Sequence, residues 1–108
     1  MKFELDIKPI SINKFFQGRR FITPEGKEYQ RLYHFLLPKK KMIKGYVKMD
    51  ITFEMANRFS VRDLDNPIKP LIDAIVKKGI IEDDRFITEL NIKKVKADKE
   101  RVKIKIYE

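Results

Sequence analysis

The chain has 108 residues, which predicts a single domain and excludes a second core of ordinary size. Its 25 Lys and Arg outnumber its 16 Asp and Glu, and the net charge of +9 favours polyanionic partners, nucleic acid before an anionic membrane. No cysteine is present, which excludes disulfides, thiolate nucleophiles and cysteine-bound zinc. Because no apolar run reaches the length of a bilayer span and no export signal is visible, we expect a protein that is neither exported nor membrane-spanning. We expect it in the cytoplasm, associated with the nucleoid, with DNA and not a membrane as its partner.

The first third of the chain predicts a strand, a loop and a helix. Residues 3–7 alternate apolar and charged side chains, as in a half-buried strand, and Pro9 ends the pattern. Residues 11–23 lose the alternation and predict a loop rich in bases and aromatic side chains. Thr23 suits the N-cap of a helix over 24–37, where apolar residues recur at helical spacing.

A strong strand and a second helix follow. Alternation over residues 47–55 is the clearest strand signal in the chain. The apolar residues of 68–76 mark the helix, which Gly79 closes and for which Asp65 or Asn66 is the expected cap. Regular helix is expected only from Pro70 onward, because proline restricts the residue before it and lacks a donor.

The last part of the chain predicts two strands after an acidic turn. The turn covers residues 80–85, and the strands cover 86–97 and 101–107. The alternating bases of 101–105 predict a solvated face on the last strand. The expected fold is α/β (α+β): a single domain over 1–108 with one mixed β-sheet of about four strands and two helices, in the order β-α-β-α-β-β.

Acidic residues gather in one part of this basic chain. Residues 63–89 carry seven acids and four bases, so this segment has a net charge of −3 and the remainder +12. Capture of a cation explains such an acidic island. Capping of a helix and compensation of nearby lysines explain it equally well, and the charge pattern alone leaves both interpretations open.

The spacing of the acids favours a hard cation. Asp63 and Asp65 follow a strand two residues apart, so in extended chain their carboxylates share one side with Cα atoms about 6.6 Å apart. A helix that folds back on the sheet is expected to return Asp83 and Asp84 toward the same strand end. Carboxylates without His or Cys favour Mg²⁺ or Mn²⁺, which suits a metal-dependent phosphodiesterase. Carboxylates also commonly cap helices at such junctions.

The stretch Arg62–Ala74, which reads R-D-L-D-N-P-I-K-P-L-I-D-A, resembles the RusA-type Holliday-junction resolvases when taken with Gly79 and Glu82–Asp84. Members of this family are nucleases of recombination and repair, often carried by phages and prophages. The resemblance covers about residues 3–95 and implies an α/β homodimer that nicks opposing strands of four-way DNA junctions with Mg²⁺ or Mn²⁺. The resemblance also implies that Asp63, Asp65 and Asp84 are the metal-binding catalytic acids and that Lys69 is a catalytic lysine near the scissile phosphate.

Two of the acidic positions near these residues have less defined roles. Asp83 is expected outside the immediate metal shell, because adjacent residues tend to face opposite ways. Asp73 lies one helical turn after Lys69, so an exposed ion pair is the simplest interpretation of both. The resemblance instead favours an ion pair that positions Lys69 for stabilising charge on phosphate.

Basic residues in the loops around the first helix predict the DNA surface. Contacts to DNA phosphates do not depend on the DNA sequence, so basic side chains in loops can provide them. The candidates are Lys14, Arg19, Arg20, Lys39, Lys40, Lys41, Lys44 and Arg62. Phe15 and Phe16 would either wedge into an opened junction or pack internally. Two other functions stay open: a noncatalytic nucleic-acid-binding module, and a nuclease for a broader range of branched substrates.

Overall fold

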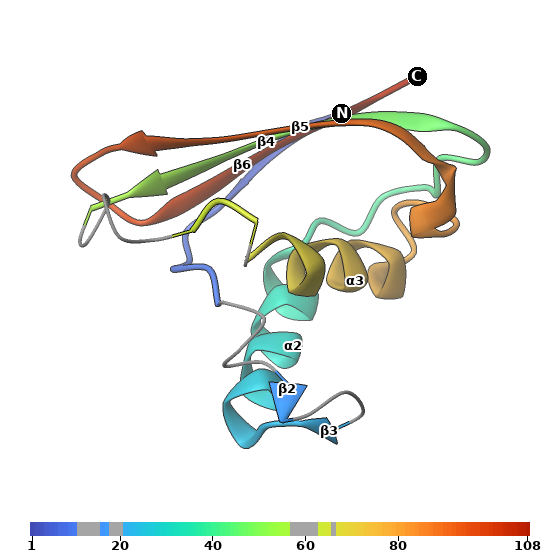
Figure 1. The fold of residues 1–108 in the computed structure, drawn as a ribbon. Helices are drawn as coiled ribbons and strands as arrows, with labels where there is room; N and C mark the ends of the chain where they lie inside the picture. Colours follow the sequence, from blue (N-terminus) through green and yellow to red (C-terminus); the bar gives the residue numbers. More distant parts are fainter. Residues whose placement is uncertain (11–15, 18–20, 57–62, 66) are drawn as a thin grey trace.

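The computed structural model describes residues 1–10, 16–17, 21–56, 63–65 and 67–108. In these residues a sheet of four strands carries helices on one face (Figure 1). The sheet comprises β1 (Lys2–Leu5), β4 (Val47–Met55), β5 (Ile87–Lys96) and β6 (Arg101–Tyr107), and the helices are α2 (Pro24–Leu36), α3 (Ile68–Lys78) and the 3-10 helix η2 (Asp84–Phe86). A small hairpin of β2 (Phe16–Gln17) and β3 (Phe21–Ile22) lies where the sequence predicted a loop.

The sheet is mixed, as predicted, with the strand order β1-β6-β4-β5. β4 runs antiparallel to β6 and parallel to β5, and α3 forms the crossover between the parallel pair. The strands β5 and β6 are neighbours in sequence, but β4 lies between them. Their short connection is tied to the end of β4, where the Ala97 N–H donates to the Met55 carbonyl and the Ala56 N–H to Glu100 Oε2 at 2.6 Å.

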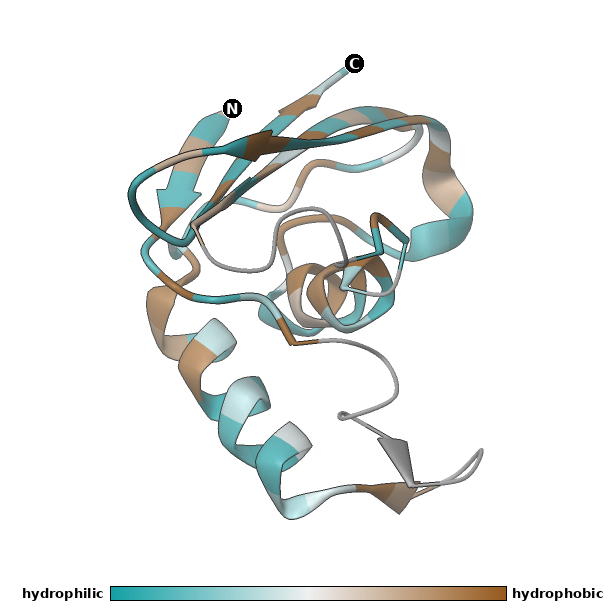
Figure 2. Ribbon diagram, turned by 60° about the vertical axis from the view of Figure 1, so that its left-hand side comes forward, coloured by the Kyte–Doolittle hydropathy of each residue, from teal (hydrophilic) through white to brown (hydrophobic). Residues whose placement is uncertain are grey.

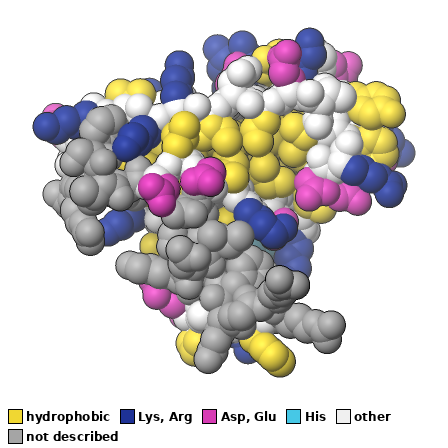
Figure 3. All heavy atoms as spheres, viewed as in Figure 1, with side chains coloured by type: hydrophobic (Ala, Val, Ile, Leu, Met, Phe, Trp, Pro, Cys, Tyr) yellow, Lys and Arg dark blue, Asp and Glu magenta, His cyan; other side chains and the backbone are white. Residues whose placement is uncertain are grey.

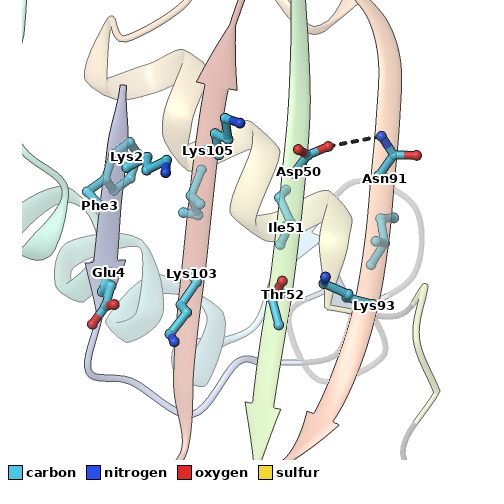
Figure 4. A pocket seen from close by; sticks show the side chains of 12 residues that line it. Lys2, Phe3, Glu4, Asp50, Ile51, Thr52, Asn91, Lys93, Lys103 and Lys105 are labelled. Atoms are coloured by element: carbon cyan, nitrogen blue, oxygen red, sulfur yellow. Dashed lines mark hydrogen bonds between the residues drawn. The ribbon is translucent and has the colours of Figure 1, made fainter.

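One face of the sheet forms the core and the other is open to solvent. Side chains of β4 alternate between fully buried residues, such as Met49 and Phe53, and partly exposed ones. β6 follows the same alternation, and Lys103 and Lys105 stand on its exposed side, which confirms the predicted basic face. Figure 4 looks onto this open face, with the helices behind the sheet.

Helix α2 begins at the predicted residue and ends at Leu36, one residue early. Thr23 caps it, because Thr23 Oγ1 accepts a hydrogen bond from the Gly26 N–H at 2.9 Å. Tyr33 is buried, whereas Leu32, which the helical spacing placed on the apolar side, is 40% exposed. Lys78 Nζ donates to the carbonyl of His34 at 2.6 Å, so the ends of the two long helices are joined by a cation at a helix C-terminus.

Helix α3 lies beneath the sheet and buries Leu71 and Ile75 against it. Figure 2 shows α3 almost end-on under the strands, with α2 to one side. The helix begins at Ile68, earlier than the predicted regular start at Pro70, because Pro70 sits in the first turn where its missing N–H has no helical partner to lose. Gly79 ends it in the left-handed region with φ 82°, as predicted. No helix among the described residues is long and apolar enough to cross a membrane.

Candidate active site

Asp63 and Asp65 lie between the end of β4 and the start of α3. Both are exposed, whereas Leu64 between them is half-buried against the core. Leu64 packs against the core and so anchors this short segment. Figure 1 shows the segment just before the N-terminal end of α3. Two carboxylates therefore face solvent from either side of one apolar anchor.

The prediction that Asp65 caps α3 is wrong. The N-cap is Pro67, and no side chain makes a capping hydrogen bond to it. The backbone carbonyl of Asp65 instead accepts a hydrogen bond from the Ile68 N–H at 3.2 Å. Asn66, the other expected cap, lies outside the described residues. Because main-chain atoms close the first turn, the helix does not need the Asp65 carboxylate.

Asp83 and Asp84 lie beyond the other end of α3, in the turn that leads to β5. Asp83 Oδ1 accepts a hydrogen bond from the Asp84 N–H at 2.7 Å, and Asp83 Oδ2 lies 3.9 Å from Arg85 Nε. The ring of Phe86 packs edge-on against Tyr46 with centroids 5.6 Å apart. The Asp83 side chain thus shapes the turn, while the Asp84 side chain is exposed.

The two carboxyl groups shift each other's pKa in opposite directions. The hydrogen bond between their side chains is the largest cause, and it raises the pKa of Asp84 and lowers that of Asp83. Desolvation and the negative charges of Asp83 and Asp73 raise the pKa of Asp84 further, whereas the charge of Lys69 lowers it. The Asp84 N–H and the charge of Arg85 lower the pKa of Asp83. The raised pKa of Asp84 therefore reflects chiefly its hydrogen bond with the Asp83 side chain, and the nearby negative charges add to it.

A groove between α3 and β5 connects this turn with the helix surface. Lys69 and Asp73 lie on its α3 wall and form an exposed ion pair, with Lys69 Nζ 3.6 Å from Asp73 Oδ2. Asp84 lines the same groove, and apolar side chains of both elements form much of its surface. Figure 3 shows this apolar band below the front edge of the sheet, with acidic side chains along its border. The groove thus brings together Lys69 and Asp84, two residues of the predicted site, and adds Asp73.

The structure does not return Asp83 and Asp84 to the end of β4, as expected, but to its beginning. β5 is parallel to β4 and Ile87 pairs with Val47, so the turn before β5 lies at the edge where β4 starts. A crossover between parallel strands must run back along the sheet, and α3 has 11 residues, about 16 Å of helix. Among the described residues, no three His, Cys, Asp or Glu side chains are grouped to hold one metal ion.

The basic turn after α2 is attached to the acidic turn. The Ile43 N–H donates to the Ile80 carbonyl at 2.9 Å, and the Gly45 N–H donates to Glu82 Oε1 at 3.0 Å. The side chains of Lys39, Lys40, Lys41 and Lys44 are all exposed in this turn. The other predicted DNA contacts, Lys14, Arg19, Arg20 and Arg62, lie outside the described residues, as does Phe15, and the side chain of Phe16 is not described.

Sequence reasoning did not identify the part that Glu82 plays. Its carboxylate fixes the start of β4 to the acidic turn through Gly45, whose φ of 83° favours glycine. Only the run Glu82–Asp84 marked this residue in the sequence, and the run did not reveal a contact 37 residues away.

Residues 10–107 match the family model described as Endodeoxyribonuclease RusA, so the chain belongs to the family of RusA endodeoxyribonucleases. It is 43% identical over 61 residues to a crossover junction endodeoxyribonuclease RusA of Aquifex aeolicus (strain VF5), a match that covers 56% of this chain and 48% of that protein. A protein of the same description from Enterobacteria phage HK97 is 29% identical over 113 aligned residues, covering 93% of this chain and 88% of the phage protein. The first match thus spans about half of its relative's length and the second most of it.

Proposed function

We propose that this chain is a metal-dependent, structure-selective endodeoxyribonuclease that resolves four-way DNA junctions by paired nicks in recombination and repair. The observation that carries the proposal is the match of residues 10–107 to the RusA family. The two relatives are described as crossover junction endodeoxyribonucleases, and the relative from phage HK97 supports a phage or prophage origin. Such an enzyme would work in the cytoplasm, where the nucleoid is.

The proposed ligands of Mg²⁺ or Mn²⁺ are Asp63 and Asp65, which precede α3, and Asp84, which lies beyond its other end. Their chemistry fits, because all three are exposed carboxylates and hard cations prefer such oxygens. Magnesium commonly takes only one or two carboxylates and completes its shell with water and phosphate oxygens, so two acids at one end of α3 suffice for a site. A bound divalent cation would neutralise phosphate charge and lower the pKa of a water molecule.

Lys69 is the proposed catalytic lysine. Its ammonium group lies in the groove that Asp84 also lines, and its charge acts on the Asp84 carboxyl group. The ion pair with Asp73 holds the long side chain along the helix surface. In this position Lys69 would stabilise the negative charge that develops on a phosphate during cleavage.

The proposed DNA contacts are the loop bases named above, Lys14, Arg19, Arg20, Lys39, Lys40, Lys41, Lys44 and Arg62. The attachment of the basic turn to the acidic turn supports the role of the four lysines, since it carries them to the end of α3 that holds Asp84. We also propose a homodimer. A four-way junction has two-fold symmetry, so a C2 dimer would present two equal sites to opposing strands.

The test compares the wild type with Asp63→Asn on a synthetic four-way junction and on the matching linear duplex, with Mg²⁺, Mn²⁺ or EDTA. We expect symmetric, metal-dependent nicking of the junction alone by the wild type, and loss of nicking with retained binding in the variant. Asp6→Asn is the matched control. Asp6 is an exposed acid outside the proposed site, and it pairs with Arg101. Tight binding without cleavage in any metal would instead indicate a binding module, and equal cleavage of other branched substrates a broader nuclease.

A further inference from the structure

Strand β5 forms an edge of the sheet. It is ten residues long and pairs with β4 on one side, while its other edge faces no strand among the described residues. Such an edge presents a row of backbone donors and acceptors, which makes it a template for a strand of another chain. Lysines commonly protect edges of this kind, and β5 carries Lys93, Lys94 and Lys96 in its second half.

The two faces of β5 differ in chemistry. Leu90 and Ile92 pair with the buried residues Met49 and Ile51 of β4, so they point to the helix side. Glu89, Asn91 and Lys93 pair with Lys48, Asp50 and Thr52, so they point to the open side. Figure 4 shows Asn91 and Lys93 on this open face, with Asn91 Nδ2 donating to Asp50 Oδ1 at 2.9 Å.

We propose that two copies of this chain associate by antiparallel pairing of their β5 strands about a two-fold axis at Asn91. This register places Glu89 opposite the partner's Lys93 on the open face, and symmetry makes the ion pair twice. On the helix side it places Leu90 opposite the partner's Ile92. Cross-strand pairs of both kinds stabilise antiparallel sheets. The inference rests on the homodimer in the proposed function and names the surface that forms it.

Neighbouring registers lack this complementarity. A two-fold axis at Glu89 or at Lys93 places like charges directly opposite each other, which destabilises a sheet. An axis at Leu90 leaves Glu89 opposite Asn91, without an opposite charge. An axis at Ile92 places Leu90 opposite Lys94. The sequence Glu89–Lys93 is therefore self-complementary about its central residue alone.

The groove between α3 and β5 supports a second copy of this chain as the partner of the β5 edge. Ile68 and Ile72 of α3 and Leu90 of β5 line it, and Leu90 is 37% exposed. Figure 3 shows the resulting apolar band on the surface below β5. Continuation of the sheet across β5 would place the partner's helix-side residues of β5 next to this band and remove it from water.

Asn91→Cys tests the register directly, because the chain has no cysteine of its own. Directly opposed residues of antiparallel strands have Cα atoms about 4.5 to 5.5 Å apart, a separation that a disulfide spans. We expect oxidation to convert Asn91→Cys into a covalent dimer on a non-reducing gel. Val95→Cys is the control, since Val95 is exposed on the same strand but would lie about 26 Å along the strands from its symmetry mate.

A charge exchange tests the ion pair. We expect Glu89→Lys and Lys93→Glu each to raise the dimer dissociation constant at least about tenfold in sedimentation equilibrium, and the double variant to restore it. Restoration also shows that the variants fold. A monomeric wild type, equal masses for all variants, or cross-linking of Val95→Cys in place of Asn91→Cys would each overturn the inference. None of these measurements involves DNA or metal, so they stand apart from any failure of the cleavage assay.

Discussion

The two acidic segments at the ends of α3 differ in how the fold holds them. The Asp83–Asp84 turn is fixed by several contacts: a 2.7 Å hydrogen bond within the pair, a ring contact between Phe86 and Tyr46, and attachment to the basic turn. In the Asp63–Asp65 segment, Leu64 is half-buried against the core and the Asp65 carbonyl accepts a hydrogen bond from the Ile68 N–H. The Asp83–Asp84 turn is thus tied to a second turn of the chain, and the Asp63–Asp65 segment is anchored to the core and to the start of α3.

Neighbouring carboxylates of the same residue type can therefore have different roles. At the Asp83–Asp84 turn one carboxylate organises the backbone and the other has its pKa raised by its neighbour, so the roles within the pair are separated by local geometry. Substitutions at the two ends of α3 and along it test this separation of roles.

The largest effect is expected for Asp84→Asn. If the exposed carboxylate is the metal ligand of its pair, the rate of junction nicking in saturating Mg²⁺ falls on the order of a hundredfold or more. The matched control Asp83→Asn should retain nicking within about tenfold and lower the melting temperature slightly, because the amide oxygen still accepts from the Asp84 N–H but lacks the negative charge that strengthens this hydrogen bond and attracts Arg85. Equal losses of nicking in both variants with unchanged melting temperatures would contradict the division of roles.

Lys69→Ala is the next largest prediction and concerns the surface between the two ends. We expect at least a tenfold slower nicking rate, while the free energy of unfolding changes by at most about 0.5 kcal/mol, because the lost ion pair with Asp73 is exposed. Single-turnover cleavage and urea unfolding measure the two effects. Lys77→Ala, an exposed lysine on the same helix, is the control, and a similar rate loss there would remove the case for Lys69.

Lys39→Ala should have a smaller effect, confined to DNA affinity. The loss of one phosphate contact weakens junction binding and reduces the slope of log K against log salt by about 1, without changing the rate of bound enzyme. Binding titrations at several salt concentrations measure the slope. Lys99→Ala, in the polar turn before β6, is the comparison variant. An unchanged slope for Lys39→Ala would show that the basic turn does not reach DNA.

The smallest expected effect is on protein stability and concerns Tyr33 of α2, which is buried in the core. Burial raises the pKa of Tyr33, and the Ile10 backbone offsets this only in part. The unfolded chain thus releases the phenolic proton from about pH 10, where the folded protein still retains it, so Tyr33 lowers the free energy of unfolding as pH rises above that value. Tyr33→Phe should remove this alkaline loss and, since the hydroxyl can contribute at most one hydrogen bond to the Ile10 backbone, change stability at neutral pH by at most about 1 kcal/mol. Thermal unfolding between pH 7 and 11 tests both expectations.

Local signals predicted the elements well, because their causes lie within a few residues. The Thr23 cap, the alternation of β4 and the glycine that ends α3 all depend on short-range sterics and hydrogen bonds. The cap at Asp65 failed for a local reason as well: the main chain closed the turn and left the side chain out of it. The small hairpin of β2 and β3 was missed, since strands of two residues carry no periodicity.

The residue pattern alone predicted the order of the two long helices and of the four strands of the sheet, the mixed α/β class and the spacing of residues that resemble the RusA family, a membership that the family match confirms. The pattern did not predict that β4 lies between β5 and β6, or that α3 carries Asp84 to the start of β4 and not to its end; the folded chain shows both. The physical reason is that strand pairing depends on hydrogen bonds between segments far apart in the chain, whose partners no local pattern specifies.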